Sequence, residues 1–115
     1  MAESFASEVR DFALSFEGAR EEFSFGPEHP VFKAPNGKMF ALSGEAEDGT
    51  HVSLKLTPEE VVEALTLPFV DPAPYLSKHH WIRSTISNEV ELEATLQWIA
   101  RSHELVTAKG ARKRQ

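Results

Sequence analysis

The chain has 115 residues, a formal net charge of −6 and no cysteine. This length and a 41% share of apolar residues predict one globular domain with its own core, expected over residues 1–110 and followed by a basic tail at 111–115. The missing cysteine excludes disulfides, thiolate metal sites and thiol catalysis. The sequence shows neither a signal peptide nor an apolar run long enough to span a membrane, so a cytoplasmic protein is expected.

The first predicted element is an amphipathic helix over residues 4–17. Ser4 is its expected N-cap and Gly18 its expected C-cap. Large apolar side chains recur at spacings of four, three and four, and so share one helical face: Phe5, Val9, Phe12 and Phe16. A stripe of this kind indicates packing against a core.

Short segments of alternating polarity come next and predict strands. The expected strands are 22–25, 30–34, 38–43 and 51–56. Asn36-Gly37 predicts an antiparallel hairpin between the second and the third, because both residues tolerate positive φ. The acidic stretch 44–50 is expected to be a loop. In the strand expected over 51–56, the alternation predicts a sheet with one covered face and one more polar face. The more polar face bears His51, Ser53 and Lys55.

A second helix is predicted to begin at Thr57. Thr57 has the features of an N-cap, Pro58 follows at the first helical position, and Glu60 completes a capping box. Its expected apolar side is formed by Val61, Val62 and Leu65. Pro68 is expected to end the helix and to open a rigid connection over 68–75.

Residues 80–86 predict another strand. Its alternation places His80, Ile82, Ser84 and Ile86 on one face, and Trp81, Arg83 and Thr85 on the other. Asn88 and Glu91 then predict the start of a final helix over 89–108. His103 falls in a gap of that helix's apolar stripe and is expected to be a hydrogen-bonded histidine at the edge of the core.

The sequence offers no recognisable catalytic constellation, so a non-enzymatic protein is expected. The serines lack a nucleophile-elbow context, and no glycine-rich phosphate loop occurs. His79 and His80 are adjacent and would point to opposite faces of a strand, which argues against a shared metal ion. We therefore expect no metal site and no cofactor.

A binding face is the stronger hypothesis. An aromatic ring beside cations can stack on a base or a peptide side chain while the cations neutralise phosphate. The candidate residues for binding nucleic acid or a partner are Lys33, Lys38, Lys55, Lys78, His79, His80, Trp81 and Arg83. The alternative is that Trp81 plugs the edge of a small core, with Lys78 and Arg83 keeping that edge soluble.

Several ordered pieces of the chain resemble the MmcQ/YjbR family of small bacterial proteins. The most specific piece runs from Lys78 to Trp81. The matching pieces together cover nearly the whole chain: 23–27, 31–33, 37–42, 52–55, 75–82 and 102–106. Arg83 is not part of what the resemblance carries over.

The resemblance implies an α+β fold of the secretion-chaperone-like, "double wing" type, with helices packed on one face of an antiparallel sheet. It also implies DNA binding, by analogy of fold. The alternative is a protein- or peptide-binding module that uses the same face. Because the net charge is −6, a DNA contact has to be local, and it requires the candidate cations to cluster without interspersed acids. The oligomeric state stays open.

Overall fold

The structure is a computed structural model that describes residues 4–74 and 76–108. The predicted basic tail at 111–115 lies outside the described residues. The elements in chain order are α1 (Ala6–Leu14), β1 (Arg20–Glu22), β2 (Val31–Lys33), β3 (Met39–Ala46), β4 (Gly49–Lys55), α2 (Pro58–Ala64), β5 (Val70–Pro72), the 3-10 turn η1 (Ser77–His79), β6 (Trp81–Ile86) and α3 (Glu89–Thr107).

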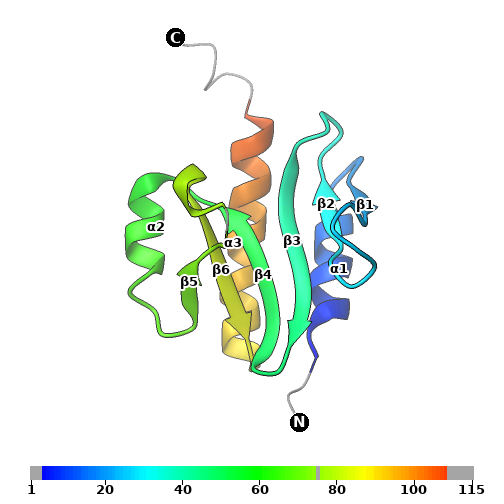
Figure 1. The fold of residues 1–115 in the computed structure, drawn as a ribbon. Coiled ribbons are helices and arrows are strands. Elements are labelled where there is room, and N and C mark those ends of the chain that lie inside the picture. Colours follow the sequence, from blue (N-terminus) through cyan, green and yellow to red (C-terminus); the bar gives the residue numbers. More distant parts are fainter. Residues whose placement is uncertain (1–3, 75, 109–115) are drawn as a thin grey trace.

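The strands form one antiparallel sheet in the order β1-β2-β3-β4-β6-β5. Helices α1 and α3 lie side by side on one face of it, and α2 lies at the β5–β6 side (Figure 1). The core is the layer between this face and the helices, with Phe32, Leu54 and Ile82 from the sheet and Val9 and Ile99 from the helices. The predicted α+β architecture, with helices on one face of an antiparallel sheet, is confirmed.

The first helix buries its predicted stripe but is shorter than predicted. Phe5 and Val9 are fully buried, and the partly buried Phe12 and Phe16 pack against the same core. The helix begins after Phe5, whose N–H donates to Thr50 Oγ1 at 2.9 Å, so Ser4 is not the N-cap. It ends at Leu14 because the N–H and the hydroxyl of Ser15 both donate hydrogen bonds to the carbonyl of Phe12.

The Asn36-Gly37 hairpin between β2 and β3 is confirmed, with Gly37 at φ +87°. The strand predicted over 22–25 is wrong: β1 ends at Glu22, and Phe23 and Phe25 are 50% and 60% exposed. Its partner strand begins at Val31, directly after Pro30. Proline has no N–H to donate, so the ladder stops at this pair.

The acidic stretch predicted as a loop over 44–50 is mostly strand. β3 continues to Ala46 and β4 begins at Gly49, leaving only Glu47 and Asp48 in the turn. Likewise, the proline-rich connection over 68–75 contains the edge strand β5. Proline is tolerated at an edge because the outer side of the strand needs no partner.

Strand β6 shows the predicted alternation, but it begins one residue later than predicted. His80 has left-handed φ and ψ of 69° and 36°, which ends η1 and excludes this residue from the strand. Ile82, Ser84 and Ile86 are buried on the helix-covered face. His80 is exposed, although the predicted alternation placed it on the same face as these buried residues.

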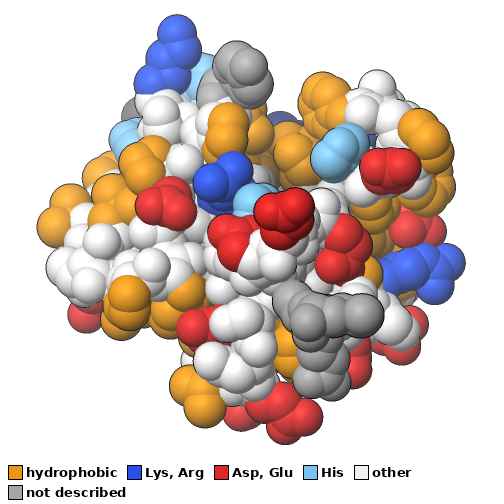
Figure 2. Space-filling model, turned by 60° about the horizontal axis from the view of Figure 1, so that its bottom comes forward, with side chains coloured by type: hydrophobic (Ala, Val, Ile, Leu, Met, Phe, Trp, Pro, Cys, Tyr) orange, Lys and Arg blue, Asp and Glu red, His pale blue; other side chains and the backbone are white. Residues whose placement is uncertain are grey.

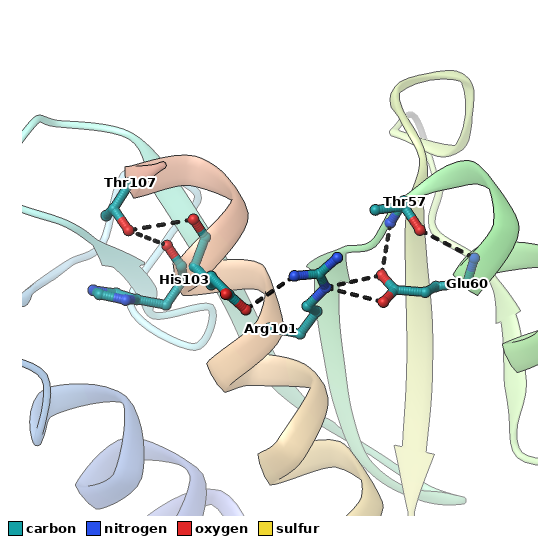
Figure 3. Close-up of polar contacts among 6 residues, drawn as sticks. Thr57, Glu60, Arg101, His103 and Thr107 are labelled. Carbon is teal, nitrogen blue, oxygen red and sulfur yellow. Dashed lines mark hydrogen bonds and ion pairs between the residues drawn. The ribbon is translucent and has the colours of Figure 1, made fainter. Parts of the chain in front are cut away.

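The capping box at the start of α2 is confirmed. Thr57 Oγ1 accepts from the Glu60 N–H, and the Glu60 carboxylate accepts from the Thr57 N–H at 3.0 Å (Figure 3). The same carboxylate bonds Arg101 of α3 at 2.9 Å. Partial burial raises the pKa of Glu60, but the bonds from Thr57 and Arg101 outweigh it and the pKa is lowered. The predicted apolar side is wrong for Val62 and Leu65, which are 70% and 38% exposed, because the helix packs through Ala64 and Val61 instead.

The last helix agrees with its prediction, since Asn88 Oδ1 accepts from the Glu91 N–H at 2.9 Å. His103 lies at the edge of the core as expected, stacked on Phe16 at 4.1 Å and edge-on to Phe40 at 4.9 Å. The expected hydrogen bond is absent: its buried Nε2 has no partner in the described part of the chain. The ring is held by aromatic contacts instead.

The surroundings of His103 give a pH-dependent stability. Burial lowers its pKa below the ordinary 6.5, so the unfolded chain takes up a proton at a higher pH than the folded one. Stability should therefore fall as the pH drops below about 6.5 and until the pH passes the folded pKa. We expect a lower urea midpoint at pH 5.5 than at pH 7.5.

A His103→Phe variant keeps an aromatic ring in the stack and removes the titrating group. Its urea midpoint should change less than that of the unsubstituted protein across the same interval. The carboxylates with a lowered pKa, Glu22, Asp48 and Glu60, lose stabilising charge only below their ordinary values of 3.8 to 4.5, outside this window. An identical pH response in the two proteins would contradict the assignment to His103.

Candidate functional site

The sheet has a second face, opposite α1 and α3, which we call the open face. At its centre the register pairs His51 with Thr85, Ser53 with Arg83, and Lys55 with Trp81. Residues directly opposite each other in an antiparallel pair project to the same side. Trp81, Arg83, Ser53 and Lys55 therefore share this face of the sheet.

Trp81 is on this face but is only 6% exposed. The segment leading from β5 runs past it, with the Ala73 N–H bonded to the Trp81 carbonyl and Ala73 itself buried. The indole is therefore not available to stack on a base in this conformation. Its position matches the alternative in which Trp81 fills the edge of a small core.

The adjacent histidines lie on an exposed turn rather than on a strand. His79 ends η1 and His80 follows it in the left-handed conformation. No group of three His, Cys, Asp or Glu side chains in the described ranges is arranged to hold a metal ion. These two rings are thus surface groups at the entry to β6.

The four candidate lysines share one end of the sheet. Lys33 ends β2, Lys38 immediately precedes β3, Lys55 ends β4, and Lys78 lies in η1 just before β6. Because neighbouring strands run in opposite directions, these positions meet at the upper end of the sheet in Figure 1. We call them the lysine end. From β2 to β6 it crosses three strand spacings, or about 14 Å.

Several of the cations already have partners. Lys33 Nζ lies 2.9 Å from Glu22, a hydrogen bond that lowers the pKa of that carboxyl. Lys55 Nζ donates to the carbonyl of His79 at 2.9 Å. The fifth candidate, Arg83, lies halfway along the open face, 4.0 Å from Asp71.

Figure 2 shows Lys and Arg side chains in separate places on the surface it presents, with acidic side chains around the central one. Since the four lysines lie at strand ends and Arg83 lies beside Asp71 along the open face, the five predicted cations do not form one continuous patch. Four come together at the lysine end, and Arg83 stands apart among acids. The structure brings together only part of the predicted site.

A small cavity of about 190 Å³ opens on the open face beside Arg83. It lies between β3, β4 and β6, with the β1–β2 loop and the β5–β6 connection on its sides. The lining residues are His29, Leu42, Ser43, Gly44, Glu45, His51, Ser53, Pro74 and Arg83. We call it the Arg83 pocket.

Most residues of the Arg83 pocket were not singled out by the sequence. The alternation of β4 does place His51 and Ser53 on one face, and this was the available signal. No sequence signal pointed to His29, because it comes from an irregular loop. It lies so close to the sheet that a Cβ on Gly44 would be 2.8 Å from its Nδ1.

Two polar groups of the pocket lining, His51 and Glu45, already have partners within the protein. His51 Nε2 bonds Asp48 at 2.9 Å, and this bond lowers the pKa of the Asp48 carboxyl. The Glu45 carboxylate accepts hydrogen bonds from the hydroxyls of Ser4 and Thr50. This leaves Arg83 as the permanently charged donor at the cavity.

Comparisons with known proteins agree with the fold. A family model described as YjbR matches residues 14–105. The structure is similar to a crystal structure of the Deinococcus radiodurans protein DR2400, described by the domain DUF419, with 29% sequence identity and a TM-score of 0.81, covering 93% of this chain and 81% of that one.

It is also similar to a crystal structure of a Pseudomonas syringae protein, with 21% identity and a TM-score of 0.64, covering 84% of this chain and 96% of that one. At this identity the likeness concerns the fold alone. No curated protein matches the chain. Among the described residues, no helix has the length and apolar character needed to cross a membrane.

Proposed function

The chain belongs to the YjbR family, and from this premise we propose that it is a non-enzymatic DNA-binding protein that contacts phosphates through the lysine end of its sheet. The observation that carries the proposal is the convergence of Lys33, Lys38, Lys55 and Lys78 on neighbouring strand ends. The acidic β3–β4 turn, with Glu47 and Asp48, lies at the opposite end. This acidic turn is therefore separated from the lysine end along the strands, and Glu22, paired with Lys33, is an acid within the lysine end.

The dimensions of the lysine end suit a DNA backbone. One strand of B-DNA carries a negative charge about every 3.4 Å along the helix axis, so a row of about 14 Å faces roughly four phosphates. Trp81 is buried, so base stacking by its ring, as first predicted, plays no part in this proposal. Contacts limited to phosphates position a protein without reading sequence. The proposed binding is therefore independent of sequence.

Fluorescence anisotropy with a labelled DNA duplex at 50 and 200 mM salt tests the proposal. Neutralising about four phosphates gives a slope of roughly −3.6 in log affinity against log salt, or about a 100-fold loss over this interval. A Lys38→Gln/Lys78→Gln double variant should reduce the slope by about 2. Both lysines are exposed, so the fold should be unaffected.

Arg10→Gln is the matched control, since it removes an exposed cation of α1, on the helix-covered side of the sheet. This variant should bind like the unsubstituted protein. No binding at 50 mM salt would end the DNA proposal. So would binding that responds equally to the Arg10 and the lysine substitutions, because that would reflect net charge alone.

A second candidate function is a protein- or peptide-binding module that uses the open face. The exposure of Phe23 and Phe25, 50% and 60%, favours it, because both belong to the β1–β2 segment that also supplies His29 to the Arg83 pocket. Exposed aromatic side chains are common anchors at protein interfaces. Because this candidate has no nucleic-acid role, it predicts that the labelled duplex is not bound even at 50 mM salt.

A further inference from the structure

Arg83 has a buried donor that is left unpaired. Its Nε–H has no hydrogen-bond partner among the described residues. Within the same residues its one ion pair, from Nη2 to Asp71, is 4.0 Å long, and Asp71 is 60% exposed. A guanidinium offers five donors in a rigid fork, and a buried donor without an acceptor is destabilising. The side chain therefore has donors to offer to a ligand.

The Arg83 pocket is where an acceptor can be supplied. Ser53, which is directly opposite Arg83 in the register and 6% exposed, forms part of its floor together with Leu42. His29 closes one side, packed against Gly44. A cavity of about 190 Å³ is smaller than a typical ligand pocket of roughly 300–1,000 Å³. It suits a few heavy atoms, such as a small acid.

We propose that the Arg83 pocket binds the carboxylate of a small organic acid, with the Arg83 guanidinium as its anchor. The planar fork of a guanidinium matches a carboxylate, which can accept two parallel N–H bonds. The inference does not depend on the proposed DNA contact, because Arg83 lies away from the lysine end.

The charges around the pocket select a monoanion. Asp71 lies beside Arg83, and Asp48 is close enough for the Arg83 charge to contribute to lowering the pKa of its carboxyl. These two acids, together with Glu45 in the pocket lining, repel a doubly charged ligand about twice as strongly as a singly charged one. A carboxylate therefore fits this site better than inorganic phosphate does. The apolar side chains of Leu42 and Pro74 in the pocket lining favour an acid with a short apolar group.

NMR titration of the full chain with sodium propionate tests the proposal, at constant ionic strength maintained with sodium chloride. We expect a saturable shift of the Arg83 Nε–H resonance, accompanied by the backbone amides of Ser53 and Gly44. Inorganic phosphate should require at least a 10-fold higher concentration for the same shift. A peptide with a free C-terminal carboxylate serves as a third ligand and shows whether the acid can be part of a longer chain.

Two variants complete the test. Arg83→Gln should weaken propionate binding at least 10-fold, and Arg20→Gln, which removes an exposed cation of β1, should leave it unchanged. The titration of the unsubstituted protein decides the matter even if Arg83→Gln does not fold. Shifts that do not saturate, that spare the Nε–H, or that are stronger with phosphate would overturn the proposal.

Discussion

Replacing Gly49 with alanine should destabilise the protein by roughly 3 kcal/mol or more. Gly49 begins β4 at φ +143°, a backbone conformation that residues with a side chain rarely adopt. A Cβ at this position would be 2.4 Å from the Ile86 carbonyl oxygen and 3.0 Å from its carbon. These are backbone atoms of β6, so the contact can be relieved only by moving a strand.

Gly37→Ala is the matched control. Gly37 also has a positive φ, +87°, but nothing lies within 4 Å of a Cβ built there. This variant should therefore show the backbone strain alone, about 1 kcal/mol. Urea unfolding followed by circular dichroism, with unchanged m-values, measures both free energies. Equal losses in the two variants would show that close approach to β6 does not constrain Gly49.

Removing the hydroxyl of Ser102 should cost about 2–5 kcal/mol of folding free energy, since one buried and one partly buried backbone group lose a partner. Ser102 is fully buried in α3. Its hydroxyl donates to the Phe40 carbonyl at 2.7 Å and accepts from the Lys55 N–H at 3.0 Å. The paired residues of β3 and β4 extend only as far as Leu42 and Ser53 at this end. The helix thus supplies the hydrogen bonds where the two strands separate.

The measurements are urea unfolding of Ser102→Ala and hydrogen exchange of the Lys55 amide, which should accelerate in the variant. Thr107→Ala provides the comparison in the same helix, because the Thr107 hydroxyl only donates to the helix carbonyls of His103 and Glu104 (Figure 3). The folding free energy lost in Thr107→Ala should be below about 1 kcal/mol. A loss no larger in Ser102→Ala than in Thr107→Ala would refute this role.

Local signals predicted the elements that have a local cause. The capping box at Thr57, the Asn88 cap and the Asn36-Gly37 hairpin all formed as expected, because each depends on residues within a few positions. The alternation of β4 and β6 likewise gave the correct faces. The predictions were wrong where pairing with another strand sets the end of an element. β1 ends where its partner strand reaches Pro30, and β3 and β4 pair with each other through the stretch predicted to be a loop.

The same distinction between local and distant causes applies to the candidate site. Periodicity and short motifs were sufficient to predict the α+β class, the family resemblance and the residues of β6 that share a face with Trp81. They could not predict that Trp81 is buried, that four lysines meet at one end of the sheet, or that His29 and Arg83 border one pocket. These facts depend on strand order and on where the loops pack, and residues far apart in the chain determine both.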